Sequence, residues 1–164
     1  MPSNYMDKFD SAEAFIRSEL LANRGTHNIV SRAELLDAVY HAAPPGNVDL
    51  SNATKAEIFD RLVELVGARA YTMYPVGVSS HCFQLKFGIT HREVLKMANT
   101  GFLKATGTSE FRMYGRYCSA ATYDPYQYYS LTMEEVHEWL DTHKRIQRKK
   151  KEEDNEATDP GDRE

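Results

Sequence analysis

Apolar residues recur every three or four positions in three segments of the N-terminal half of the chain, which is the spacing of a buried helix face. Each segment begins with a polar residue that is followed three positions later by glutamate, the pattern of a helix capping box. Each segment ends at glycine or at a proline pair. We therefore predict helices at about 11–24, 32–42 and 55–67, with the capping pairs Asp10 and Glu13, Ser31 and Glu34, and Thr54 and Glu57.

The pattern changes after the third predicted helix. Phe83, Leu85 and Phe87 alternate with less apolar neighbours, as residues of a half-buried strand do. The segment before them is rich in proline, glycine and serine, which is typical of a hairpin loop. We expect strands at about 69–75 and 81–87. Three helices followed by a hairpin are the element order of a winged-helix domain.

A second predicted unit follows, which also combines helices with a hairpin. Thr90 and Glu93 form the next capping pair, and Thr132 and Glu135 form the last one. The predicted elements are a helix at 91–99, strands at 102–106 and 110–118 joined by a loop at 107–109, and a helix at 133–146. The prediction is an α+β protein of tandem winged-helix-like units, each a helical bundle with a β-hairpin wing. The units span 1–88 and 89–147.

The second unit resembles a known family. Its sequence, THREVLKMANTGFLKATGTSEFRMYGRY followed later by LTMEEVHEWL, is similar to the winged-helix DNA-binding modules of the MerR and phage-excisionase type. The resemblance covers residues 90–140 and implies a helix that enters a DNA groove, a two-stranded wing and a helix packed behind them. The aromatic insert at 120–130 and the missing tight helix-turn-helix spacing before residue 90 depart from that family.

The charges are distributed unevenly. The chain has a net charge of −4, but residues 86–118 carry six basic residues against two acidic ones, whereas residues 119–143 carry five acidic residues and no lysine or arginine. A local basic segment can bind a polyanion even when the net charge is negative. Double-stranded DNA is therefore the first expected partner. We expect a small transcriptional regulator or recombination accessory factor, of a kind that phages and mobile elements encode.

The candidate DNA-binding residues lie in the basic segment. One helix face has residues suited to reading bases or positioning the duplex, and the following hairpin has basic and aromatic residues suited to phosphate contact and stacking. An ordinary solvated helix face and an ordinary wing strand are the alternatives. The residues are Arg92, Lys96 and Asn99 on the helix, with Lys104, Arg112, Tyr114 and Arg116 after it; Arg112, Tyr114 and Arg116 would share one strand face.

A tyrosine-rich segment supports a second hypothesis, in which the partner is a protein. Tyrosine gives a large, rigid contact area with a polar tip, so protein-binding surfaces are rich in it. Under this hypothesis the chain is an inhibitor or adaptor, such as a phage-encoded inhibitor of a host enzyme or RNA polymerase. The alternative is an aromatic plug under the last helix. The residues are Tyr123, Tyr126, Tyr128 and Tyr129.

Catalysis is not predicted. The six histidines are scattered, and the chain has no glycine-rich phosphate loop and no nucleophile or zinc-protease motif. We expect no enzyme activity, no cofactor and no metal site.

The remaining features set the expected location and assembly. The start of the chain does not read as a signal peptide, and no apolar run is long enough to cross a bilayer. Cys82 and Cys118 are expected to be reduced. Together with the features of the preceding sentence, this predicts a cytoplasmic location without membrane contact. The charged segment 148–164 is expected to be disordered. Self-association as a homodimer stays open.

Overall fold

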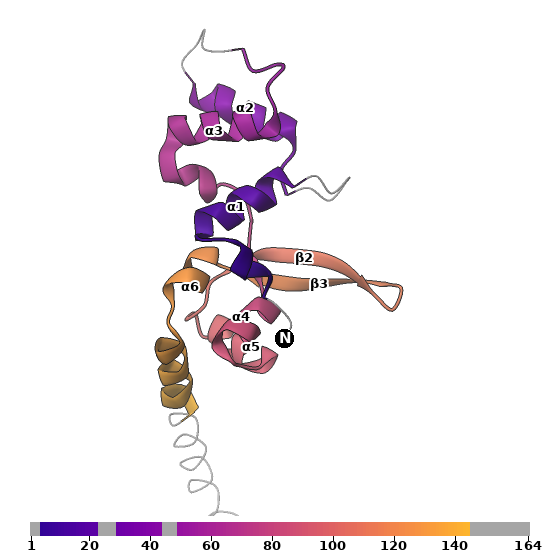
Figure 1. Ribbon diagram of the computed structural model, residues 1–164. Helices are drawn as coiled ribbons and strands as arrows, with labels where there is room; N and C mark the ends of the chain where they lie inside the picture. The colour runs from indigo at the N-terminus through magenta and orange to yellow at the C-terminus, as the bar shows by residue number, and fades with distance from the viewer. Residues whose placement is uncertain (1–3, 23–28, 44–48, 145–164) are drawn as a thin grey trace, which may run out of the picture.

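The computed structural model describes residues 4–22, 29–43 and 49–144, with the backbone alone at 110–113 and 117. The described chain is α+β and combines helices with a three-stranded antiparallel sheet of order β1-β3-β2 (Figure 1). The predicted disordered segment, 148–164, lies outside the described residues. In chain order the elements are η1 (Tyr5–Lys8), α1 (Ala12–Leu21), α2 (Arg32–Ala42), α3 (Lys55–Val66), η2 (Gly67–Tyr71), β1 (Val78–Ser79), α4 (Ser80–Phe87), α5 (His91–Asn99), β2 (Ala105–Met113), β3 (Arg116–Tyr123), α6 (Pro125–Ser130) and a helix at 133–144.

Polar caps start the helices largely where the sequence predicts. The capping boxes at Ser31 and Thr90 are complete, with both reciprocal hydrogen bonds, before α2 and α5. Thr54 accepts from the backbone of the third residue of α3 in the same way. The predicted cap of α1 is wrong by one residue, because Ser11 rather than Asp10 accepts the backbone hydrogen bond. Three of these four helices therefore begin at the predicted residue.

The first predicted hairpin is wrong. Its second strand is instead the helix α4, which Ser79 caps and which ends at Gly88 with a left-handed φ of 62°. Phe83 and Phe87 are one helical turn apart and are both fully buried, whereas Leu85 between them is 38% exposed. A strand would have placed all three on one face. The N-terminal unit thus continues from three α-helices into the 3-10 helix η2, the two-residue strand β1 and α4, without its predicted wing.

The second hairpin is present, but its turn is displaced. Strands β2 and β3 pair from Ala105 with Tyr123 to Met113 with Arg116, so the predicted loop at 107–109 lies inside β2. The chain reverses at 114–115, where both residues have positive φ. Two residues of that conformation form the type I′ turn that suits the twist of a hairpin. The polar run of glycine, threonine and serine indicated a loop, but cross-strand pairing extends through it.

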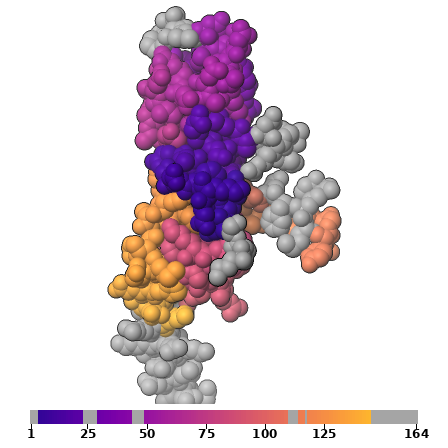
Figure 2. Space-filling view, in the orientation of Figure 1, coloured from indigo at the N-terminus to yellow at the C-terminus, as the bar shows by residue number. Residues whose placement is uncertain are grey.

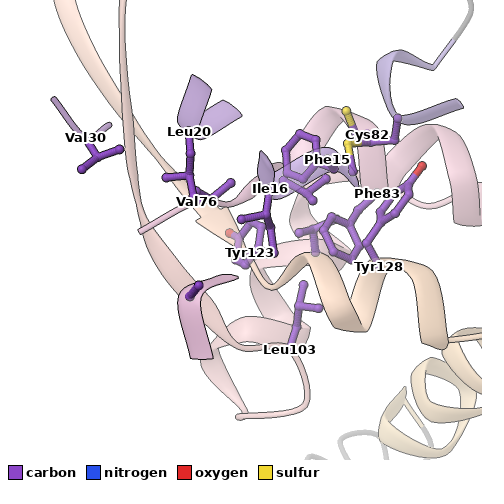
Figure 3. Packing of buried hydrophobic residues seen from close by; sticks show 14 of the residues in the cluster. Phe15, Ile16, Leu20, Val30, Val76, Cys82, Phe83, Leu103, Tyr123 and Tyr128 are labelled. Carbon is purple, nitrogen blue, oxygen red and sulfur yellow. The ribbon is translucent and has the colours of Figure 1, made fainter. Parts of the chain in front are cut away.

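One hydrophobic cluster joins most of the described elements and takes side chains from both sequence units, from Met6 to Leu140. Phe83 of α4 lies near its centre and packs edge-on against Tyr123 of β3 and Tyr128 of α6, with ring centroids 5.8 and 5.2 Å away (Figure 3). Burial of such rings is a major stabilising contribution to small proteins.

Most of the β2–β3 hairpin lies outside the packed core. Helices α2 and α3 form one end of the molecule, whereas the β2–β3 hairpin stands out sideways from the body (Figures 1 and 2). We call residues 105–123 the ribbon. In the described part of the chain, no helix has the length and apolar character that crossing a membrane requires.

Candidate nucleic-acid interface

The outer part of the ribbon is exposed. Thr108 and Ser109 on β2, and Ser119 and Ala120 on β3, are exposed although they lie inside a sheet. Tyr114 at the tip is 97% exposed. Nine residues of β2 at strand spacing span about 30 Å, so the tip lies well beyond the helices at its base. The outer part of the ribbon is therefore accessible to a partner.

The ribbon carries two of the predicted arginines near its tip. Arg116 is exposed, and it pairs across the ladder with Met113. Arg112 lies on the neighbouring rung, opposite Tyr117. Because neighbouring rungs alternate between the faces of a sheet, positions 112 and 116 lie on opposite faces. The expectation that both arginines share one strand face is wrong, since the turn reverses the chain between them.

Helix α5 is amphipathic, as the sequence predicts. Val94 and Met97 are fully buried, whereas Arg92 and Asn99 are exposed. Lys96 is half-buried and takes part in a further interaction within the chain. Two of the three predicted side chains of α5 are therefore exposed.

The structure divides the predicted DNA-binding residues into two groups. Lys104 is exposed at the base of the ribbon, five residues after the end of α5. The hydrogen bond from the Leu103 backbone N–H to the Met97 carbonyl, at 3.0 Å, holds this short connection against the helix. The α5 face and Lys104 thus lie at one end of the ribbon. Arg112, Tyr114 and Arg116 lie at or next to its tip.

Basic residues elsewhere in the described chain are often paired with acids. Arg17 lies 3.3 Å from Asp60, and Arg61 lies 2.8 Å from Glu64. By contrast, Arg92, Lys104 and Arg116 have no carboxylate partner within the described residues. Arg69 and Lys86 also lack a carboxylate partner among the described residues, so this property alone does not distinguish α5 and the ribbon.

The four tyrosines proposed for a protein interface are mostly internal. Tyr123 and Tyr128 are 1% and 3% exposed, and Tyr126 and Tyr129 are half-buried. The Tyr129 hydroxyl donates to the Met6 carbonyl at 3.0 Å. Burial raises the pKa of all four phenols, because it disfavours the charged phenolate. The arrangement is that of the aromatic plug, the alternative that the sequence left open.

Two groups of interacting polar side chains were not predicted from the sequence. The Ser80 hydroxyl lies 2.7 Å from Nδ1 of His91, and the Gln84 amide donates to the same hydroxyl at 3.0 Å. Lys86 of α4 lies against the aromatic rings of α6. Both depend on α4 being a helix, so the strand prediction for this segment concealed them.

Cys82 and Cys118 are free thiols. Among the residues that the structure describes, no three histidine, cysteine or acidic side chains gather as metal ligands would. Comparison of the chain with protein-family models gives no match, and searches of curated proteins and of solved structures give no significant match either.

Proposed function

We propose that this protein binds double-stranded DNA and that the ribbon provides the main contact. The observation that carries the proposal is a projecting two-stranded ribbon with exposed sides, an exposed tyrosine at its tip and an arginine position on each face beside that tip. The major groove of B-form DNA admits a two-stranded ribbon as well as a helix. Arginine side chains from positions on opposite faces would then contact the two phosphate walls of one groove.

Helix α5 and Lys104 extend the contact at the base of the ribbon. Arg92 and Asn99 are exposed on one face of α5, and both residue types can pair with base edges. We propose that α5 and the ribbon act as a helix-and-wing unit, which is the arrangement that the MerR and excisionase resemblance implies. A regulator of transcription or an accessory factor of recombination would use such a unit. The proposal does not use the N-terminal unit, in which the predicted hairpin wing is not present.

The test is fluorescence anisotropy with a labelled duplex of mixed sequence at low salt. We expect the double variant Arg112→Ala, Arg116→Ala to bind roughly tenfold or more weakly than the parent chain. The matched control is Arg17→Ala, Arg61→Ala, which removes the same charge from α1 and α3. If the two double variants lose affinity equally, or if the parent does not bind any duplex, the proposal is wrong.

A second candidate function, binding of a protein, rests on a different surface. Glu134, Glu138 and Asp141 are exposed at successive turns of the helix at 133–144 and form an acidic stripe. Such a stripe suits a basic partner surface, including one that otherwise holds nucleic acid. Capture of a protein that survives nuclease treatment, and that is lost in the variant Glu134→Gln, Glu138→Gln, Asp141→Asn, would favour this function over DNA binding.

A further inference from the structure

A pocket lies between η1, α4 and α6. Its volume is about 470 Å³, which is within the range of small-molecule sites. Aromatic and aliphatic side chains line it together with polar groups, including one base and one acid. The lining residues are Asn4, Met6, Asp7, Phe9, Leu85, Lys86, Tyr128 and Tyr129.

The base, Lys86, contacts a backbone carbonyl and aromatic rings rather than a carboxylate. Its ammonium donates to the Tyr128 carbonyl and lies 4.4 Å from the centroid of the Tyr128 ring and 5.7 Å from that of Tyr129. No carboxylate in the described part of the chain pairs with it. Burial lowers the pKa of Lys86, because the charged form loses hydration. An ammonium with one carbonyl acceptor retains two N–H donors for a ligand.

The Tyr128 hydroxyl is held in place by Asn4. One Asn4 amide hydrogen donates to that hydroxyl at 2.6 Å, and the amide also donates to the Cys82 carbonyl at 3.1 Å. The Asn4 side-chain oxygen accepts from the Met6 backbone N–H at 3.1 Å, so the orientation of the amide is fixed. The phenol therefore serves as an acceptor for Asn4. Its own proton has no acceptor among the described residues.

The carboxylate of Asp7 contributes a negative charge to the pocket wall. Asp7 is exposed and belongs to the pocket wall. Burial is the main cause of the raised pKa of Tyr128 and Tyr129, and the negative charge of Asp7 adds to it. No basic side chain pairs with Asp7 within the described residues. The pocket thus has one unpaired charge of each sign.

We propose that this pocket binds a free α-amino acid, or a small zwitterion of the same kind, with its carboxylate at Lys86 and its ammonium at Asp7. A simple anion would lie near Asp7 without compensation, and a simple cation would face Lys86. A zwitterion satisfies both charges, and its side chain can pack against Met6, Phe9 and the tyrosine rings. This site is independent of the DNA contact proposed for the ribbon.

The test uses ligand-observed NMR and calorimetry on the full chain, with L-phenylalanine, L-leucine and L-glutamine as probes. Two analogues of phenylalanine isolate the charges: 3-phenylpropionate lacks the ammonium and phenethylamine lacks the carboxylate. We expect at least one amino acid to bind. For phenylalanine, both analogues should bind at least tenfold more weakly. The proposal is overturned if no probe binds at about 10 mM, where even a ~1 mM site would be mostly filled. It is also overturned if 3-phenylpropionate matches phenylalanine.

Two variants assign the charges. Lys86→Met keeps an unbranched stem against Tyr128 and should abolish binding, whereas Lys86→Arg should retain part of it. Asp7→Asn should remove the preference for phenylalanine over 3-phenylpropionate. Lys55→Met and Asp37→Asn are the matched controls and should leave binding unchanged. Equal effects of the pocket and control variants would show that the pocket is not the site. Because the probe comparison uses the unaltered chain, it tests the proposal even if a variant fails to fold.

Discussion

Tyr114 and Gly115 form the tip of the ribbon, and both have positive φ, at 55° and 76°. Glycine adopts this conformation freely, but a residue with a side chain does so at a cost of roughly 1–2 kcal/mol. Tyr114 has no compensating burial, since it is 97% exposed. We interpret this strained and solvated aromatic residue as a contact residue of the proposed DNA interface.

Replacing Tyr114 with asparagine should separate stability from binding. Asparagine tolerates the left-handed region and favours this turn, so we expect the free energy of unfolding to rise by about 0.5–1 kcal/mol. DNA affinity should fall, because a stacking ring of about 1–3 kcal/mol is lost. Urea unfolding and anisotropy measure the two effects. A variant that is more stable and binds equally well would show that the tyrosine makes no contact.

Gly77 should tolerate alanine poorly, for a steric reason. Gly77 lies just before β1, which pairs with β3, and a Cβ atom there would lie 2.2 Å from Oγ1 of Thr122 and 2.3 Å from Oγ1 of Thr106. We expect Gly77→Ala to cost about 1–3 kcal/mol. Gly88→Ala is the comparison: a Cβ there meets no atom within 4 Å, so only its positive φ opposes the change, at about 1 kcal/mol. Thermal unfolding should rank them in that order.

Arg32 should be essential for the segment that leads into α3. Its guanidinium donates to the carbonyls of Leu50, Ser51 and Ala53 at 3.0, 2.8 and 2.9 Å. We expect Arg32→Ala to reduce stability by about 2 kcal/mol, and Arg32→Lys to restore little, because an ammonium cannot reproduce the planar fork. The control is Arg69→Ala in η2. Full rescue by lysine would contradict the role given to the fork.

Alkaline pH should destabilise the fold through the buried phenols. Burial raises the pKa of Tyr123 and Tyr128 above the usual value of 10.0 in the folded chain. The unfolded chain therefore loses these protons first, so stability is complete below about pH 10 and falls as pH rises above it. Burial lowers the pKa of Lys86 in the folded chain. This group therefore adds stability as the pH rises toward its unfolded pKa of 10.5. Urea unfolding between pH 8 and 11 measures the balance.

The Tyr128→Phe variant identifies the main contributor to this pH dependence. It removes one ionisable phenol whose folded pKa is raised, so the decline in stability above pH 10 should become shallower. Tyr114→Phe removes an exposed phenol and is the control. If both variants change the pH dependence equally, Tyr128 is not the source of the decline.

The helices could be predicted from sequence because their signals are local. Ser31, Thr54 and Thr90 cap helices within a few residues of their own positions, and the amphipathic spacing of α5 correctly separated Met97 from Arg92. Such signals need no knowledge of the rest of the fold.

The predictions were wrong where contacts between residues far apart in the sequence determine the local structure. Residues 81–87 alternate like a strand, but α4 forms because Phe83 and Phe87 meet Tyr128, which lies more than forty positions away in the sequence. The turn at 114–115 was displaced for a related reason: pairing across β2 and β3 determines it, and Tyr114 is not a usual turn residue at positive φ. The pocket charges of Asp7 and Lys86 could not be associated without the helix α4.

The most direct test of DNA binding by the ribbon is the salt dependence of affinity for a mixed-sequence duplex. We expect log Kobs to fall linearly with log salt concentration, with a slope of about −0.9 for each phosphate contact. Arg112→Ala, Arg116→Ala should make that slope shallower by about 2, whereas Arg17→Ala, Arg61→Ala should leave it unchanged. An affinity that does not depend on salt, or a slope that the ribbon variant does not alter, would contradict the account.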